Sequence, residues 1–459
     1  MNYTTPGVKI EEVSKLPSSV VQVSTAIPVF LGYTEKGTPE TPVRISSLAE
    51  YRAEFGGPYA YKFDITAAGS VSVAQFGTSP NQVDYPAAGT FFLYEAVQLY
   101  FANGGGPCYI LPVANFPAGT ATAAQTVQAA DFGTAQSGAL AEVLTLDEPT
   151  LIAFPEAVHL SNANYQNLVQ AALSIAAETG DRMVLVDTPQ DLDLTDNGDL
   201  TSFRTLLGTQ NLSYGAAYFP HLACTTQYQI DPDTTTFGTQ TLTALQASGS
   251  AAYSDALAAL ESAGTLAVTL PPSALLAGVY AANDRGLGVW NAPANVSLQG
   301  VAGPSVAVTD GQQSKLNVDA STGKSVNAIR LFNGRGTVVW GARTLAGNSA
   351  EWRYVSVRRL FLTVEESIQK ATEPFVFAPN NSKTWVRVRS MISAYLTGLW
   401  QDGALMGAKP EEAFFVKVGL GSTMTEADVQ KGEMIVEVGI AAVRPAEFIV
   451  LKFSHLLNQ

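Results

Sequence analysis

The residues that most often carry chemistry in proteins are few in this sequence and lie far apart. The three histidines, His159, His221 and His455, are isolated from one another, and none has a partner at a zinc-site spacing such as H-x-x-x-H. The stretch STGKS at 321–325 resembles a phosphate-binding loop, but Val318 occupies the place where that motif needs a glycine. We therefore expect no metal site and no cofactor.

A serine hydrolase would need a nucleophile, a base and an orienting acid. The stretch FGTSP at 76–80 lacks the G-x-S-x-G turn that exposes such a serine, and a Ser–His–Asp triad cannot be assigned from residue types alone. The acidic pairs 365–366 and 411–412 are expected on solvated helix surfaces. Cys108 and Cys224 are too few for a zinc site or a disulfide framework, so we expect two buried thiols. No catalytic residue is predicted.

Composition indicates a globular chain of two or three domains that binds neither nucleic acid nor anionic membrane. The 459 residues are 46% hydrophobic, which is ample for several cores, and the net charge is −14. Residues 327–459 carry 15 Lys and Arg against 12 Asp and Glu, whereas residues 1–326 carry 11 against 28. Neither a run of about 18 apolar residues nor a secretory signal is evident. We therefore expect that the chain is made in the cytoplasm and does not insert into a membrane.

The middle of the chain alternates between strand and helix patterns. The stretches TLIAFPEA, DRMVLVDTP and GAAYFPHLA are expected to be strands, and NYQNLVQAALSIAAETG is expected to be an amphipathic helix that ends at Gly180. This order predicts a parallel sheet flanked by helices. The Ala- and Thr-rich stretches 114–142 and 228–264 have weak periodicity and are expected to be surface insertions.

Other patterns set the elements around this domain. Ser47 and Glu50 have the spacing of a capping box and predict a helix in SSLAEYRAEFGG. In the last third, strands are expected on both sides of the turn NGRG, followed by two long helices, the second capped by Asn381 or Ser382, and by the strands AFFVKVGL and GEMIVEVGIAAV. These elements predict a compact α+β unit.

Both termini are expected to be extended arms. The first 25 residues are too poor in apolar side chains to form a core. The stretch VRPAEFIVLKF at 443–453 is apolar on both faces of a strand, and Pro445 belongs at the start of that strand because it has no N–H. An exposed edge of this kind invites pairing with another chain, so we expect the C-terminal strand to pair with a partner chain.

A set of segments resembles the contractile-tail sheath proteins of phages and phage-like injection particles. The similar segments, in chain order, include TPGVKIEEV, TAIPVFLGYT, PVRISSLAEYRAEFGG, AVQLYFANGGGPCYILPV, LIAFPEA, GDRMVLVDTP, LPPSALLAGVYAANDRGLGVWNAPANVSLQGV, LFNGRGTVVWGARTL, EWRYVSVRRL, FVFAPNNSKTW, LWQDGALMGAKPEEAFFVKV and RPAEFIVLKF. The resemblance extends over nearly the whole chain. It departs at Ala274, where the family tends to have Gly, and at His221, where Trp is common.

The resemblance implies a fold that is α/β and α+β multidomain. The α/β domain would be subtilisin-like and non-catalytic, and a C-terminal α+β sheath domain would carry the N- and C-terminal arms. The expected ranges are the N-terminal arm 1–25, the N-terminal part of the sheath core 26–113, the α/β domain 114–300 with outer acidic insertions 114–142 and 228–264, the sheath domain 301–442 and the C-terminal arm 443–459.

The family likeness also implies how the subunit works and with which partners. It would polymerise with itself as hexameric rings in a helical sheath around an inner tube protein, with baseplate and tail-terminator proteins at the ends, and would contract without a bound nucleotide. The near-neutral C-terminal unit is expected to face the tube, where residues 425–432 are the candidate tube contact. Neighbouring subunits would be joined through Val8, Ile10 and Val13 of the N-terminal arm and through Pro445, Phe448, Ile449, Val450, Leu451 and Phe453 of the C-terminal arm, with Gly439, Ala441 and Ala442 as candidate hinges.

Two other classes of protein stay open at this point. One is an α/β hydrolase-like enzyme, which would need a nucleophile–base pair in a pocket. The other is a shell protein that uses the same strand exchange in a flat lattice. The sheath interpretation makes the chain part of a phage tail or of a phage-like injection particle, cytoplasmic or released.

Overall fold

The chain folds into two compact units in the computed structural model. Unit 1 comprises residues 1–23 and 363–443, and unit 2 comprises residues 24–362 and 444–459. The structure describes residues 20–65, 71–73, 91–116, 127–189, 192–194, 197–262 and 267–448.

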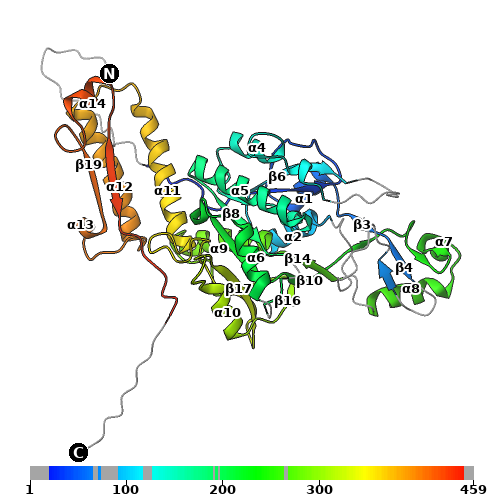
Figure 1. Cartoon of the computed structure of the whole chain (residues 1–459). Coiled ribbons are helices and arrows are strands. Elements are labelled where there is room, and N and C mark those ends of the chain that lie inside the picture. The colour runs from blue at the N-terminus through cyan, green and yellow to red at the C-terminus, as the bar shows by residue number, and fades with distance from the viewer. Residues whose placement is uncertain are drawn as a thin grey trace, which may run out of the picture. The chain divides into compact units, whose positions relative to one another are not determined.

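A nine-stranded sheet forms the centre of unit 2 (Figure 1). Its six central strands run parallel, and antiparallel strands lie at both sides. The order across the sheet is β15 (Val296–Ser297), β18 (Gly336–Val339), β17 (Val326–Phe332), β9 (Gly215–Phe219), β8 (Met183–Asp187), β7 (Leu151–Ala153), β1 (Pro28–Thr34), β6 (Cys108–Asn115) and β2 (Val43–Ile45). The alternation of strand and helix patterns therefore led to the correct, mixed α/β class.

Helices cover both faces of this sheet because its strands are apolar on both sides. In β8, Met183 and Leu185 belong to one hydrophobic cluster, and Val184 and Val186 belong to another. The first cluster includes residues of α2 (Leu93–Ala102) and α9 (Ser273–Leu287), and the second includes residues of α5 (Asn162–Thr179) and α6 (Asn197–Leu206). The remaining helices of unit 2 include α1 (Leu48–Phe55), α10 (Asp310–Asn317) and the 3-10 helices Val143–Thr145, Pro155–His159 and Leu212–Tyr214.

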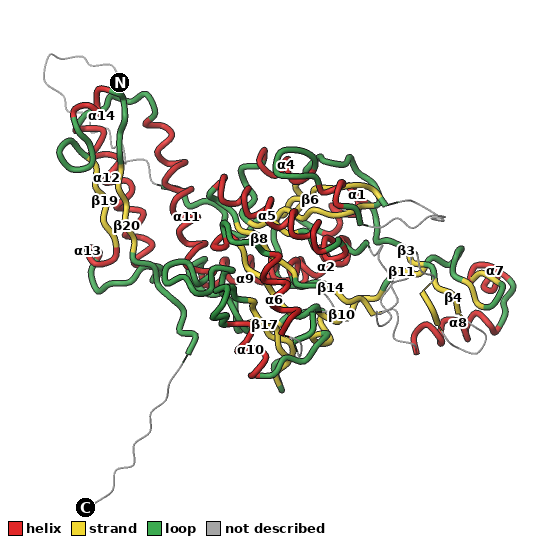
Figure 2. The backbone as a smooth tube through the Cα atoms, in the orientation of Figure 1, coloured by secondary structure: helices red, strands yellow, loops and turns green. Residues whose placement is uncertain are grey.

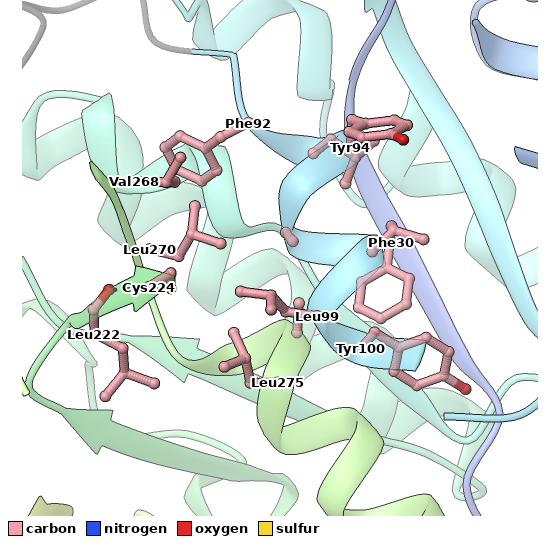
Figure 3. Packing of buried hydrophobic residues seen from close by; sticks show 14 of the residues in the cluster. Phe30, Phe92, Tyr94, Leu99, Tyr100, Leu222, Cys224, Val268, Leu270 and Leu275 are labelled. Carbon is pink, nitrogen blue, oxygen red and sulfur yellow. Dashed lines mark hydrogen bonds between the residues drawn. The ribbon is translucent and has the colours of Figure 1, made fainter. Parts of the chain in front are cut away.

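The first cluster packs α2 and α9 closely together (Figure 3). Tyr100 of α2 lies edge-on against Phe30 of β1, with ring centroids 5.1 Å apart, and Leu99 lies beside Leu275 of α9. A Cβ atom at Gly278 of α9 would lie 2.4 Å from the carbonyl oxygen of Tyr100. The glycine therefore allows α9 to approach the end of α2.

The first predicted insertion, 114–142, is not only a surface segment. Within 114–142, Phe132 of α3 (Ala129–Phe132) and Leu140 of α4 (Ala139–Glu142) are fully buried in the second cluster. The hydrophobic periodicity of this segment is weak because it has few large apolar residues among many alanines. Those few residues nevertheless pack into the core. Part of the segment 114–142 is thus core, which corrects the prediction for its described residues.

The second predicted insertion, 228–264, folds together with an earlier part of the chain. Strand β11 (Gln229–Ile230) pairs with β3 (Ala60–Tyr61), and β12 (Thr236–Phe237) pairs with β4 (Phe63–Ile65). Figure 1 shows β4 with the helices of this small lobe. The further elements here are β5 (Val71–Val73), β13 (Gln240–Thr241), α7 (Leu242–Ala247) and α8 (Ala251–Ser262), and a separate three-stranded sheet contains β14 (Ala267–Leu270), β10 (Leu222–Gln227) and β16 (Val301–Pro304).

Unit 1 is an α+β structure of two long helices and a β-hairpin (Figure 2). Asn381 caps the second long helix by accepting a hydrogen bond from the Thr384 N–H, as the sequence predicts. The elements are the C-terminal part of α11 (Val355–Thr372), the 3-10 helix Glu373–Phe375, α12 (Ser382–Gln401), α13 (Pro410–Ala413), β19 (Phe414–Val418), α14 (Glu426–Gln430) and β20 (Val436–Ile440).

The boundary of the last domain lies later in the chain than predicted. The predicted range was 301–442, whereas unit 1 begins this part of the chain at Thr363. Strand β17 pairs in parallel with β9, and its residue Asn327 also donates a hydrogen bond to the carbonyl oxygen of Ala217 (3.0 Å). Residues 301–362 therefore belong to unit 2, together with the large sheet. This pairing joins residues about 110 positions apart, which local patterns cannot reveal.

A candidate strand-acceptor interface

The hairpin β19–β20 is a two-stranded antiparallel sheet whose outer edges are unpaired within the described residues (Figure 2). Phe414 lies opposite Ile440, Val416 opposite Val438, and Val418 opposite Val436. Two-stranded hairpins are only marginally stable by themselves, and this one packs against α12. An exposed strand edge presents N–H and C=O groups that another chain can bind.

The hydrogen bonds of the hairpin indicate which groups point outward. The Ala441 N–H donates to the carbonyl oxygen of Ala413 (2.8 Å), so alternation along an antiparallel ladder directs the N–H and C=O groups of the 414–440, 416–438 and 418–436 pairs to the outer edges. The outward carbonyl oxygen of Val418 accepts a hydrogen bond from Arg389 of α12 (2.5 Å), which agrees with this assignment. The edge of β20 therefore offers the groups of Val436, Val438 and Ile440. On the edge of β19, the Phe414 N–H donates to the carbonyl oxygen of Pro410 and the Val418 carbonyl oxygen is bound by Arg389, so that edge offers fewer groups.

The outward face of the hairpin carries a compact cross-strand cluster. Phe415 lies opposite Gly439, and Lys417 lies opposite Glu437 with an N–O distance of 3.8 Å. The ammonium group of Lys417 is 4.6 Å from the centroid of the Phe415 ring. These contacts order the outward face without using the backbone groups of the outer edges.

A groove of about 770 Å³ lies beside β20 within unit 1. Its lining is mostly apolar, and includes Val436 and Val438 of β20 and Ile368 and Thr372 of α11. The other lining residues are Phe375, Val376, Phe377, Ala378, Asn380, Thr384, Ile392, Gly432 and Met434. A strand that pairs with β20 would have an apolar surface beside it for every second side chain.

The loop that leads into α12 borders this groove and exposes large apolar side chains. Phe377 is fully exposed (102%), and its backbone lies in the left-handed region with φ of 66°. Val376 is 63% exposed. Asn380 fixes the loop because it accepts a hydrogen bond from the Trp385 indole (2.6 Å) and donates one to the carbonyl oxygen of Glu433 (2.9 Å). An exposed aromatic residue on a strained backbone indicates a surface that binds a partner.

The predicted hinge residues lie in hydrogen-bonded backbone. Gly439 is within β20, and Ala442 forms a bridge with Leu405. The carbonyl oxygen of Ala441 accepts a hydrogen bond from the Met406 N–H (2.7 Å). Their role as hinges stays a prediction.

The structure describes only part of the predicted arms. Val8, Ile10 and Val13, like Ile449, Val450, Leu451 and Phe453, lie outside the described residues. Pro445 and Phe448 are described, and Phe448 is exposed. Sequence analysis missed the groove residues around Phe377, although the apolar stretch PFVF before a proline and two asparagines was a local signal for an exposed turn.

An Asp, a His and a Ser do lie near the carboxyl ends of the parallel strands, where α/β enzymes place their sites. Asp187 ends β8 and accepts a hydrogen bond from the backbone N–H of Ser273 (2.9 Å), and a ring nitrogen of His221 is 2.8 Å from the carbonyl oxygen of Thr188. Burial raises the pKa of Asp187 to about 7 and lowers the pKa of His221 to about 4.

This group does not form a catalytic relay. Asp187, His221 and Ser273 are almost fully buried, and within the described residues no hydrogen bond joins His221 to Ser273. A nucleophile must contact its base and a substrate, and neither contact is available to the Ser273 hydroxyl in this arrangement.

Neither a metal-binding cluster nor a membrane-spanning helix is found among the described residues. Both cysteines are buried free thiols, as predicted. Across the described ranges, no group of three or more His, Cys, Asp or Glu side chains has the geometry to hold a metal ion. Among the helices that the structure describes, none is both long and apolar enough to span a bilayer.

Unpaired strand edges beside an apolar groove are typical of proteins that bind extended segments of partner chains. The profile of the phage tail sheath C-terminal domain matches residues 348–454, which include this hairpin. The chain belongs to the phage tail sheath family, as its full-length similarity to solved sheath structures shows.

Several solved structures are similar over almost the whole chain, and two of them are sheaths in the contracted state. The sheath complex of the extracellular contractile injection system PVC, in its contracted state, has a TM-score of 0.66 and 31% identity, with 99% of this chain and 98% of that chain covered. The contracted helical sheath of the anti-feeding prophage has a TM-score of 0.64 and 33% identity, with 98% and 99% covered.

Curated relatives are similar over shorter regions. The tail sheath protein of Burkholderia phage BcepMu is 30% identical over 144 residues, which are 30% of this chain and 30% of that protein. The matched regions span 26% to 37% of the length of the curated relatives.

Proposed function

We propose that this chain is the sheath subunit of a contractile tail or phage-like injection particle. The observation that carries the proposal is the hairpin β19–β20, whose two edges are unpaired within the described part of the chain and lie beside an apolar groove, in a chain that is similar over nearly its whole length to contracted sheaths. The subunit would polymerise with itself as hexameric rings in a helical sheath around an inner tube, and baseplate and terminator proteins would bound that sheath.

The arms of neighbouring subunits would be the strands that complete the hairpin. Val8, Ile10 and Val13 of one neighbour and Phe448 to Phe453 of another would extend the two outer edges. Each ladder hydrogen bond contributes roughly 0.5–1.5 kcal/mol, and the outward groups that remain on each edge would together stabilise a junction by several such increments. Apolar arm residues that fill the groove would add to this.

Contraction would follow from the geometry of this mesh. Assembly on a tube would hold the lattice in an extended, high-energy state, and rigid-body rotation of the subunits about their arms would release it and drive the tube into a target envelope. No bound nucleotide is needed for this step. In this proposal unit 2 resembles subtilisin in fold only, the acidic insertion 228–264 faces outward, and α14 faces the tube.

Electron microscopy of the purified full-length chain, alone and with its tube protein, tests the proposal. We expect hollow, helically ridged cylinders in at least one of the two samples. Flat lattices would favour the shell alternative. A monodisperse monomer in both samples would contradict the proposal and return an enzyme to consideration.

A further inference from the structure

The described part of the C-terminal arm, residues 443–448, is attached to unit 2 by the side chains of Arg444 and Glu447. After β20, the chain forms an antiparallel bridge between Ala442 and Leu405, in which the Val443 N–H donates to the carbonyl oxygen of Ala404 (3.2 Å). The next residues, 444–448, belong to unit 2. There Arg444 donates to the carbonyl oxygen of Ala350 (2.8 Å), and the carboxylate of Glu447 enters a polar site.

Three side chains bind both oxygens of the Glu447 carboxylate. Arg343 donates through Nη2 to Oε2 (2.6 Å) and through Nε to Oε1 (2.9 Å), which is the bidentate geometry of a strong ion pair. The amide of Asn317 donates to Oε1 (2.9 Å), and the hydroxyl of Tyr354 donates to Oε2 (3.2 Å). We call these three residues, Asn317, Arg343 and Tyr354, the carboxylate receptor.

The receptor is held rigidly by the large sheet. The backbone N–H of Arg343 donates to Asn327 of β17 (2.7 Å), and the amide of Asn327 donates back to the carbonyl oxygen of Arg343 (2.8 Å). Tyr354 forms an antiparallel bridge with Arg343, so the two side chains that bind Oε2 come from paired backbone. The receptor therefore provides a fixed point on the core of unit 2.

The receptor is built for a carboxylate and is costly to leave empty. The side chain of Arg343 is only 5% exposed, and that of Glu447 is 22% exposed. Without Glu447, the Arg343 guanidinium would keep its hydrogen bond to the carbonyl oxygen of Asn317 (3.1 Å) but would lose its charged partner, which destabilises a protein when the guanidinium is buried. Partial burial by itself would raise the pKa of Glu447, but the hydrogen bonds from Arg343 and Asn317 and the guanidinium charge lower it, so Glu447 stays ionised at neutral pH.

We infer that Glu447 is a positioning residue for strand exchange. Its carboxylate holds the root of the C-terminal arm on the receptor of its own subunit, so that the residues beyond it leave from one fixed point toward the hairpin of a neighbour. The inference rests on the proposed function. A tethered strand meets its acceptor at a higher effective concentration than one whose root moves freely.

The variants Glu447→Gln and Tyr354→Phe test the inference. Glu148 provides a matched control, because it too forms a bidentate pair with an arginine, Arg44 (2.8 and 3.2 Å), and accepts a hydrogen bond from a tyrosine, Tyr109 (2.8 Å), but lies outside the arm. The control variants are therefore Glu148→Gln and Tyr109→Phe.

Two readouts separate a positioning role from a merely structural one. Sedimentation of polymer from soluble subunit gives the critical concentration for assembly, and thermal unfolding of the dispersed subunit gives its stability. We expect Glu447→Gln to raise the critical concentration roughly tenfold or more, and Tyr354→Phe to raise it less. Both controls should assemble as the wild type does.

The outcomes distinguish this inference from the proposed function. A wild-type chain that never assembles, even with its tube, contradicts the proposed function, and the inference falls with it. If the wild type assembles and the folded Glu447→Gln variant assembles at the same critical concentration, the inference alone is overturned. The same holds if Glu447→Gln only lowers the melting temperature and leaves the critical concentration unchanged. If Glu447→Gln fails to fold, wild-type assembly by Tyr354→Phe overturns it.

Discussion

The ring of Phe415 covers Gly439 directly across the β19–β20 hairpin. A Cβ atom built on Gly439 would lie 2.3 Å from Cε1 of that ring and 2.6 Å from Cζ. The two residues oppose each other in register, and an aromatic side chain over a cross-strand glycine compensates for the missing side chain. This pair therefore supports the hairpin on which the proposed function depends.

The substitution Gly439→Ala is expected to weaken the hairpin. Its methyl group would displace the Phe415 ring, and the loss of one cross-strand contact costs up to about 1 kcal/mol of unfolding free energy. Chemical denaturation measures this change. The control Gly398→Ala adds a Cβ where nothing lies within 4 Å, so it should not destabilise the protein. Unchanged stability together with slower contraction would instead support a hinge at Gly439.

The substitution Val438→Pro is expected to block strand addition at β20 and leave the subunit folded. The outward N–H of Val438 is not needed by the hairpin, and proline is tolerated on edge strands where the missing N–H faces outward. Val416→Pro makes the same change on the edge of β19. We expect either variant to prevent assembly in sedimentation and electron microscopy, whereas the control Val438→Ala keeps the N–H and should still assemble. Normal polymers from both proline variants would exclude edge pairing.

The substitution Phe377→Gly is expected to weaken assembly without lowering the stability of the subunit. Because the Phe377 side chain is fully exposed and its φ is 66°, glycine relieves backbone strain and loses no core contact, so the unfolding free energy should stay the same or rise by about 1 kcal/mol. The critical concentration for assembly should rise because the groove loses an apolar wall. Leu287→Gly, at an exposed residue of unit 2, serves as the assembly control. Equal critical concentrations for Phe377→Gly and wild type would contradict a binding role for the groove.

Glu95 predicts a pH dependence of stability. Its carboxylate oxygens are buried and have no hydrogen-bond partner within the described residues, and burial, with a smaller effect of the nearby Glu156, raises its pKa from 4.5 to about 8. The unfolded chain therefore loses this proton first as the pH rises, so the stabilisation is complete below about pH 4.5 and decreases up to about pH 8, by at most about 1.4 kcal/mol per pH unit.

The variant Glu95→Gln measures this contribution. We expect its melting temperature to decrease less than that of the wild type between pH 5 and 8, while Glu54→Gln on the exposed face of α1 should follow the wild type. Parallel curves for Glu95→Gln and wild type would show that the buried carboxyl group does not titrate as expected. Two opposing effects act on the pKa of Glu156. Burial raises it to about 8, whereas hydrogen bonds from the backbone N–H groups of Tyr33, Phe92 and Leu93 favour the charged form.

Local patterns predicted the elements of the fold well where a cap or a strict period was present. Ser47 accepts a hydrogen bond from the Glu50 N–H at the start of α1, although the Glu50 carboxylate binds Ser46 instead of completing the predicted box. The hairpin strands β19 and β20 were also predicted. What failed depended on distant contacts, such as the addition of β17 to the large sheet and the burial of Phe132 in an alanine-rich segment.

The candidate site could be predicted only in part. The apolar C-terminal stretch after Pro445 indicated a strand for another chain, but no local pattern showed where that strand would bind. The groove exists because α11, the loop at Phe377 and β20 meet in three dimensions. The receptor for Glu447 likewise combines Asn317, Arg343 and Tyr354, whose spacing in the sequence carries no recognisable motif.

A cryo-electron microscopy map of the assembled particle shows whether strands from other subunits add to the hairpin. We expect each β19–β20 hairpin to be part of a larger sheet, with one strand from another subunit on the edge of β20 and a further strand on the edge of β19. A map in which the hairpin stays two-stranded, with both edges facing solvent or side chains only, would contradict it.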